Sequence, residues 1–168
     1  MDQKVHNQIV SFIWSIADDV LRDVFTRGKY RDIIIPFTVL RRLDALLNDT
    51  QEAVRKQNQF LIKENIKEKT ALSHTSGYPF WNTSRFTFYR LQSSENVDAD
   101  LENYLDGFSP NIQDIISKFK LRNNLQTLKE AGLTKLLITK FANTNINLSP
   151  KESENGKGEI LPPLTKES

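Results

Sequence analysis

The strongest constraint on the fold is the hydrophobic pattern of the first 26 residues. Placed at 100° per residue, the polar side chains of this segment fall within an arc of about 120°, and the rest of the circumference is apolar from Val5 to Phe25. The pattern predicts one continuous helix that ends near Gly28, since glycine is favoured just beyond helix ends. Such a wide apolar surface must be covered on more than one side. Either all of it lies in the core of this domain, or part of it meets another domain or subunit.

Apolar positions at helical spacing continue along the chain. They predict a helix over residues 32–47, with a bend or a start near Pro36, and a polar, exposed helix over residues 51–64. Residues 65–97 have no helical period and are rich in aromatic side chains, so we expect an irregular, partly buried segment with room for one small strand pair. Further short helices are expected around residues 97–105, 112–119, 121–128 and 133–141.

These elements predict an all-α fold. We expect an orthogonal bundle of roughly seven helices with an aromatic-rich irregular insert and a flexible C-terminal tail. The bundle domain is expected to span residues 1–148, and the tail residues 149–168, which are charged and nearly devoid of large apolar groups. Its core is expected to contain Phe12, Trp14, Ile16, Val20, Phe37, Leu40 and Leu43.

Composition excludes several classes of protein. The chain of 168 residues is 38% apolar and 26% charged, which is typical of one domain, and its formal charge is only +2. Any nucleic-acid surface must therefore be local. The absence of cysteine excludes thiol catalysis, disulfide scaffolds and cysteine-based zinc sites. No apolar run approaches the roughly 18 residues of a membrane span, and we expect a cytoplasmic protein without membrane contact.

No catalytic, cofactor-binding or metal-binding motif is present in the sequence. The six glycines are scattered rather than clustered in a phosphate-binding loop. There is no nucleophile elbow, no zinc-protease motif and no aspartate-rich metal loop. His6 and His74 are each isolated in the sequence, so neither is expected to belong to a catalytic pair.

The remaining feature is a group of basic residues around the end of the first helix and along the second. The candidates for contacts with the DNA backbone are Arg27, Lys29, Arg31, Arg41 and Arg42. Alternatively, these side chains pair with Asp23, Asp32 and Asp44 and are otherwise solvated. A second combination, Arg85 and Arg90 interleaved with aromatic residues, suits either stacking on bases or filling the gap between helices.

Several ordered blocks of sequence resemble one known family. They are residues 9–18 (IVSFIWSIAD), 30–36 (YRDIIIP), 40–44 (LRRLD), 77–84 (GYPFWNTS) and 105–116 (LDGFSPNIQDII). In order and spacing they are similar to the N-terminal helical domain of the modification (Hsd M-type) subunit of type I restriction-modification DNA methyltransferases. The resemblance covers about residues 5 to 148.

The resemblance implies a subunit of an adenine-N6 DNA methyltransferase that uses S-adenosylmethionine. Its implied partners are double-stranded DNA, a specificity subunit, a second modification subunit and a restriction subunit. The N-terminal domain of the family is expected to close over DNA and to couple methylation state to activity. The family's cofactor loop and its Asn-Pro-Pro-aromatic motif do not occur in this sequence, so we expect this chain alone to bind no cofactor and to be inactive. The alternative is a helical interaction module that docks on a catalytic domain or a neighbouring subunit without touching DNA.

Overall fold

The computed structural model describes residues 3–143. Within these residues the regular structure is entirely helical, and the only β-type pairing is an isolated antiparallel bridge between Asn82 and Phe108. The helices are α1 (Gln3–Ile16), α2 (Arg31–Leu47), α3 (Gln51–Lys63), α4 (Thr70–Ser76), α5 (Phe88–Leu91), α6 (Val97–Asp106), α7 (Pro110–Lys118), α8 (Leu121–Ala131) and α9 (Thr134–Ala142). The all-α prediction is therefore confirmed. The predicted boundary at residue 148 and the tail that follows it lie outside the described residues.

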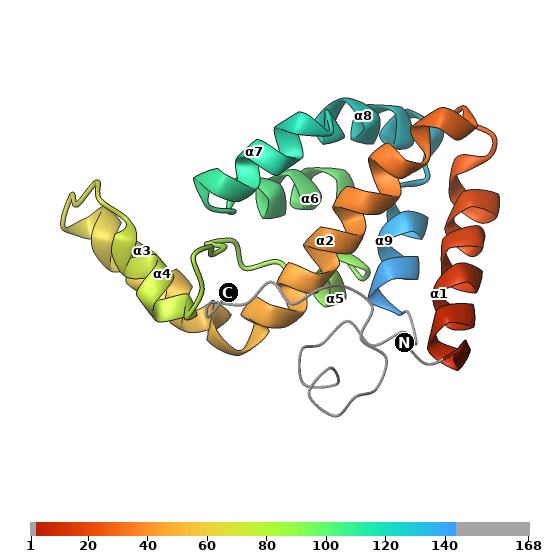
Figure 1. Ribbon diagram of the computed structural model, residues 1–168. Helices are drawn as coiled ribbons and strands as arrows, with labels where there is room; N and C mark the ends of the chain where they lie inside the picture. The colour runs from red at the N-terminus through yellow and green to blue at the C-terminus, as the bar shows by residue number, and fades with distance from the viewer. Residues whose placement is uncertain (1–2, 144–168) are drawn as a thin grey trace.

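Helix α2 crosses the centre of the molecule, and the other helices are arranged around it (Figure 1). It begins at Arg31, five residues before Pro36, so the proline lies inside the helix rather than at its start. Nine of its seventeen residues are buried. A helix that is buried on most sides is the natural centre of a small bundle.

The main core is formed by apolar residues of the first helical segment, of α2, of the insert and of α5 to α9. At its centre the ring of Phe37 on α2 lies 5.7 Å from that of Phe141 on α9 and 6.2 Å from that of Phe88 on α5, centroid to centroid. Of the predicted core residues, Ile16, Val20, Phe37, Leu40 and Leu43 are buried. These contacts join segments that are far apart in the sequence.

The first helix differs from its prediction in three ways. It becomes a π-helical turn over Ala17–Leu21 and does not continue as a regular helix to Phe25. Gly28 does not cap it and lies instead inside a separate 3₁₀ turn, Arg27–Lys29. Trp14, predicted in the core, is 56% exposed. The physical reason is position, because α1 lies at the edge of the bundle (Figure 1) and has only Ile16 fully covered.

The predicted irregular insert, residues 65–97, contains the short helices α4 and α5 and a well-packed loop. Helices α3 and α4 form a hairpin that projects from the bundle (Figure 1), with a small core of its own made by Val54, Leu61 and Leu72 against Trp81. Phe80, Phe86 and Phe88 are buried, so the aromatic residues of the insert mainly fill the space between helices.

The loop of the insert is closed by polar contacts with α6 and the residue after it. The side chain of Asn82 donates from Nδ2 to the carbonyl oxygen of Tyr104 (3.0 Å) and accepts from the backbone N–H of Ser84 (2.7 Å). A Cβ atom added at Gly107 would lie 2.2 Å from Asn82 Oδ1, so this approach requires glycine.

No described helix is both long and apolar enough to cross a membrane.

Candidate nucleic-acid interface

Three of the five predicted DNA-contact residues form one exposed feature, the basic turn, defined as Arg27, Lys29 and Arg31. Two backbone hydrogen bonds hold the turn, from Lys29 N–H to Thr26 O (2.9 Å) and from Tyr30 N–H to Arg27 O (3.1 Å). All three basic side chains are exposed. None of them takes part in an ion pair within the described residues. Within the described residues, the basic turn therefore presents three exposed positive charges that form no ion pair.

Arg41 and Arg42 do not belong to this surface. The Nε–H of Arg41 donates to the carbonyl oxygen of Phe141 (3.1 Å), and its guanidinium lies 6.0 Å from the centroid of the Phe88 ring. Arg42 is completely buried, with 0% exposure. The prediction that these two residues line the surface with the basic turn is therefore wrong for Arg42, and Arg41 is held by α9 and α5.

The cause is the path of α2 through the molecule. Arg31 and Arg42 are eleven residues apart, which places them within about 20° of the same helix face, as the sequence indicated. That face is at the surface where α2 begins and is covered by other elements near its middle and end. A shared helix face therefore does not mean a shared environment.

Asp44 lies in a polar contact between α2, α5 and α6. Its carboxylate accepts hydrogen bonds from the Tyr104 hydroxyl (3.0 Å) and from the backbone N–H of Phe88 (3.4 Å), and it lies 3.7 Å from the Arg41 guanidinium. Burial raises the pKa of Asp44 to about 6, although Arg41 and the two hydrogen bonds act in the opposite direction. Burial and the neighbouring carboxylate also raise the pKa of Tyr104. The alternative in which acidic residues pair with the basic group thus holds for Asp44 with Arg41.

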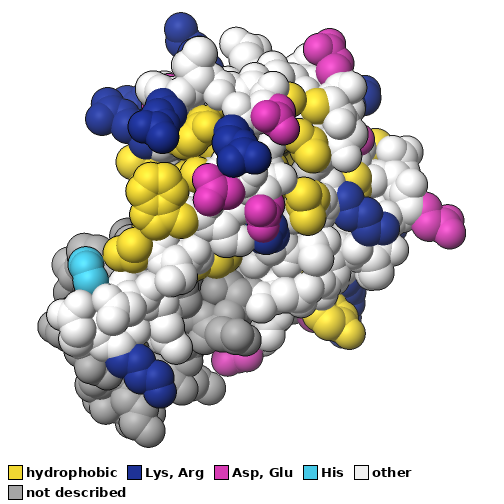
Figure 2. All heavy atoms as spheres, turned by 90° about the vertical axis from the view of Figure 1, so that its right-hand side faces the viewer, with side chains coloured by type: hydrophobic (Ala, Val, Ile, Leu, Met, Phe, Trp, Pro, Cys, Tyr) yellow, Lys and Arg dark blue, Asp and Glu magenta, His cyan; other side chains and the backbone are white. Residues whose placement is uncertain are grey.

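An apolar groove lies beside the basic turn and was not predicted as a site. Its volume is about 610 Å³, and its lining includes Ile13, Trp14 and Ala17 of the first helical segment, Arg27, Tyr30 and Arg31 of the turn region, and Ile34 and Ile35 of α2. Figure 2, which faces the α1 side, shows hydrophobic side chains next to a group of Lys and Arg side chains. The signal in the sequence was the width of the apolar arc, which exceeded what one bundle edge can cover.

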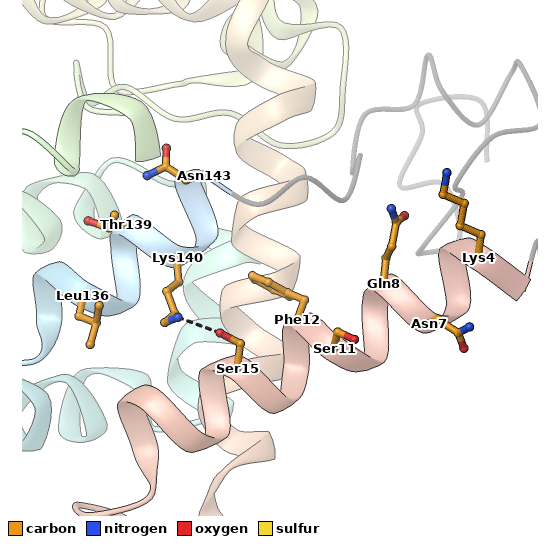
Figure 3. Close-up of a pocket in the computed structure, with 10 residues that line it drawn as sticks. All are labelled: Lys4, Asn7, Gln8, Ser11, Phe12, Ser15, Leu136, Thr139, Lys140 and Asn143. Atoms are coloured by element: carbon orange, nitrogen blue, oxygen red, sulfur yellow. Dashed lines mark hydrogen bonds between the residues drawn. The ribbon is translucent and has the colours of Figure 1, made fainter.

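A second groove separates α1 from α9 (Figure 3). It has a volume of about 1000 Å³ and is lined mainly by residues of polar type, with Phe12 and Leu136 as its large apolar side chains. At one end the Nζ of Lys140 donates to Ser15 Oγ (2.8 Å) and to Asp19 Oδ2 (2.7 Å). The bond from Lys140 lowers the pKa of Asp19. Together with the edge-to-face contact of Phe12 and Phe141, whose centroids are 5.1 Å apart, these bonds attach α1 to the bundle.

In residues 3–143 the fold and the surface together define an all-α domain with a local group of exposed basic side chains that form no ion pair. Among residues 3–143 no three or more His, Cys, Asp or Glu side chains are grouped as metal ligands. The sequence matches the family model described as the HsdM N-terminal domain over residues 9–141. Because the match covers most of the chain, this protein belongs to that family, the N-terminal domain of the modification subunit of type I restriction-modification systems. Comparisons with curated proteins and with solved structures found no match.

Proposed function

We propose that this domain holds the DNA backbone within a type I restriction-modification complex, through the basic turn. The observation that carries the proposal is the exposure of Arg27, Lys29 and Arg31 without an ion-pair partner in the described residues. Exposed Arg and Lys side chains bind phosphate groups without regard to base sequence. The family of the chain supplies the context, since modification subunits act in complexes that modify DNA.

The expected strength of this contact follows from its charge. Three phosphate contacts should give a log-log dependence of affinity on salt concentration with a slope of about −2.7. With a net charge of only +2, the isolated chain should bind duplex DNA no more tightly than about 10 to 100 micromolar, as non-specific contacts do. The contact therefore serves a complex that a specificity subunit has already placed on its target.

The test compares two triple variants with the same loss of charge. The first is Arg27→Gln, Lys29→Gln, Arg31→Gln. The control removes the exposed lysines of the α3–α4 hairpin and is Lys56→Gln, Lys63→Gln, Lys67→Gln. Duplex binding is measured against salt concentration, for the chain and for the assembled methyltransferase complex, with two unrelated sequences.

The proposal predicts that the basic-turn variant has a slope shallower by about 2.7 on both sequences, whereas the hairpin variant keeps the parent slope. Equal slopes for the parent and the basic-turn variant would refute it. A loss on one of the two sequences alone would indicate base recognition instead of backbone contact.

A second candidate function, protein docking, is favoured by one specific observation. Trp14 is 56% exposed, and Val10, Ile13 and Ile35 are exposed with it. Tryptophan together with arginine at a groove is the composition of strong protein–protein contacts. On this account Trp14→Ser weakens assembly with the neighbouring subunits and leaves the salt dependence of DNA binding unchanged, which native mass spectrometry and the titrations above distinguish.

The proposal assigns catalysis to other parts of the complex. We expect S-adenosylmethionine to be bound by a catalytic domain and not by residues 3–143, because the two grooves beside α1 are open surfaces rather than enclosing cavities. Calorimetric titration of the chain with the cofactor tests this expectation, and saturable binding at micromolar concentration would overturn it. The proposed site of action is the cytoplasm.

A further inference from the structure

The short helix α5 presents an aromatic side chain to solvent on a rigid support. Phe86 and Phe88 are buried on either side of Thr87, whose hydroxyl accepts the backbone N–H of Arg90 (3.1 Å) and caps the helix. The side-chain amide of Gln51 donates to the carbonyl oxygen of Phe86 (3.0 Å). This packing leaves Tyr89 76% exposed, more than any other large hydrophobic side chain in the described residues.

Two arginine side chains of the same short segment, Arg85 and Arg90, are exposed and held in place by contacts within it. The guanidinium of Arg85 lies 4.2 Å from the centroid of the Phe86 ring. The Nη1–H of Arg90 donates to the backbone carbonyl oxygen of Arg85 (2.8 Å). Neither arginine takes part in an ion pair among residues 3–143. Both positive charges are thus positioned by the protein without being neutralised by it.

We propose that Tyr89, Arg85 and Arg90 form a binding site for single-stranded nucleic acid, in which an unpaired base stacks on the Tyr89 ring and the adjacent phosphates lie against the two guanidinium groups. Aromatic platforms flanked by fixed cations bind single strands in this way, with little dependence on sequence. In a duplex the faces of the bases are covered by their neighbours, so an exposed ring distinguishes an unpaired base from a paired one.

This site is separate from the basic turn. Phe88 contacts Asp44, and Asp44 lies thirteen positions after Arg31 on α2, which corresponds to about 20 Å along the helix. The inference does not rest on the proposed function, because it concerns other residues and another form of nucleic acid. The two ideas can therefore fail independently.

The test uses fluorescence anisotropy at low salt with the chain and a labelled oligodeoxythymidylate of about ten nucleotides, within the site size of single-strand binders. The variants are Tyr89→Ser, Tyr89→Phe and Arg90→Gln. The control is Phe60→Ser, which removes an exposed aromatic ring from α3. Thermal unfolding of each variant verifies that the fold is retained.

The inference predicts that Tyr89→Ser weakens single-strand binding by about fivefold to a hundredfold, the range for loss of one base stack. Tyr89→Phe and Phe60→Ser should stay within about twofold of the parent, and Arg90→Gln should weaken binding and make it less sensitive to salt. Duplex binding should not respond to Tyr89→Ser. Absence of single-strand binding by the parent, equal losses for Tyr89→Ser and Phe60→Ser, or an equal loss for Tyr89→Phe would overturn the assignment.

Discussion

Replacing Asp44 by asparagine should remove most of the change in stability of this domain between pH 4 and pH 6. The pKa of Asp44 is raised from 3.8 to about 6 because the carboxylate is buried. The folded state therefore binds a proton more tightly than the unfolded state does. The contribution of Asp44 to the free energy of unfolding is fully present below its pKa in the unfolded state. It is lost as the pH rises through its pKa in the folded state. A shift of this size corresponds to about 3 kcal/mol of unfolding free energy.

The substitution is informative because it preserves shape and most contacts. The Oδ1 atom of asparagine can still accept the hydrogen bonds from the Tyr104 hydroxyl and the Phe88 N–H. Only the ionisation and the attraction to Arg41 across 3.7 Å are lost. Asp114→Asn, at an exposed carboxylate on α7, is the matched control.

The assay is urea unfolding followed by circular dichroism at a series of pH values from 4 to 7. The parent and Asp114→Asn should lose stability across this range, whereas Asp44→Asn should show a nearly flat profile and be the more stable protein at pH 7. The lowered pKa of Asp19 acts below this range and with the opposite sign. A flat profile for the parent, or an unchanged slope in Asp44→Asn, would refute the reasoning.

Other substitutions test the packing of the fold by thermal unfolding. Trp14→Ala should cost less than about 1 kcal/mol, because the ring is mostly in solvent, whereas Phe37→Ala in the central aromatic cluster should cost about 3 to 5 kcal/mol. Equal costs would contradict the placement of α1 at the edge of the bundle. Gly107→Ala should lower the midpoint clearly, since its Cβ atom would lie 2.2 Å from Asn82 Oδ1. The Arg42→Ala variant should unfold at a lower temperature than the parent, because the Arg42 side chain is fully buried. A variant with unchanged thermal stability but altered DNA binding would contradict the burial of Arg42.

Local signals in the sequence were sufficient to predict most of the helices. The apolar periodicity located α2, α3 and α6 to α9 within a few residues, and Ser109 with Pro110 marked the start of α7. Helix periodicity depends on neighbours three and four positions away, so it can be read without knowledge of the rest of the molecule. The blocks of sequence similarity likewise identified the family, which the family model confirms.

Exposure was decided by the tertiary structure. The sequence predicted that the wide apolar arc around Trp14 is covered on more than one side, but in residues 3–143 Val10, Ile13 and Trp14 are exposed. The sequence contains no information on which side of α1 the bundle lies. Arg31 and Arg42 share a helix face, yet only the first is exposed, because other elements cover the middle of α2. The sequence likewise did not indicate that Tyr89 is exposed whereas Phe86 and Phe88 are buried. A side chain's own sequence neighbourhood determines its helix and its direction, whereas its burial depends on segments distant in the chain, and those contacts form only when the whole domain packs.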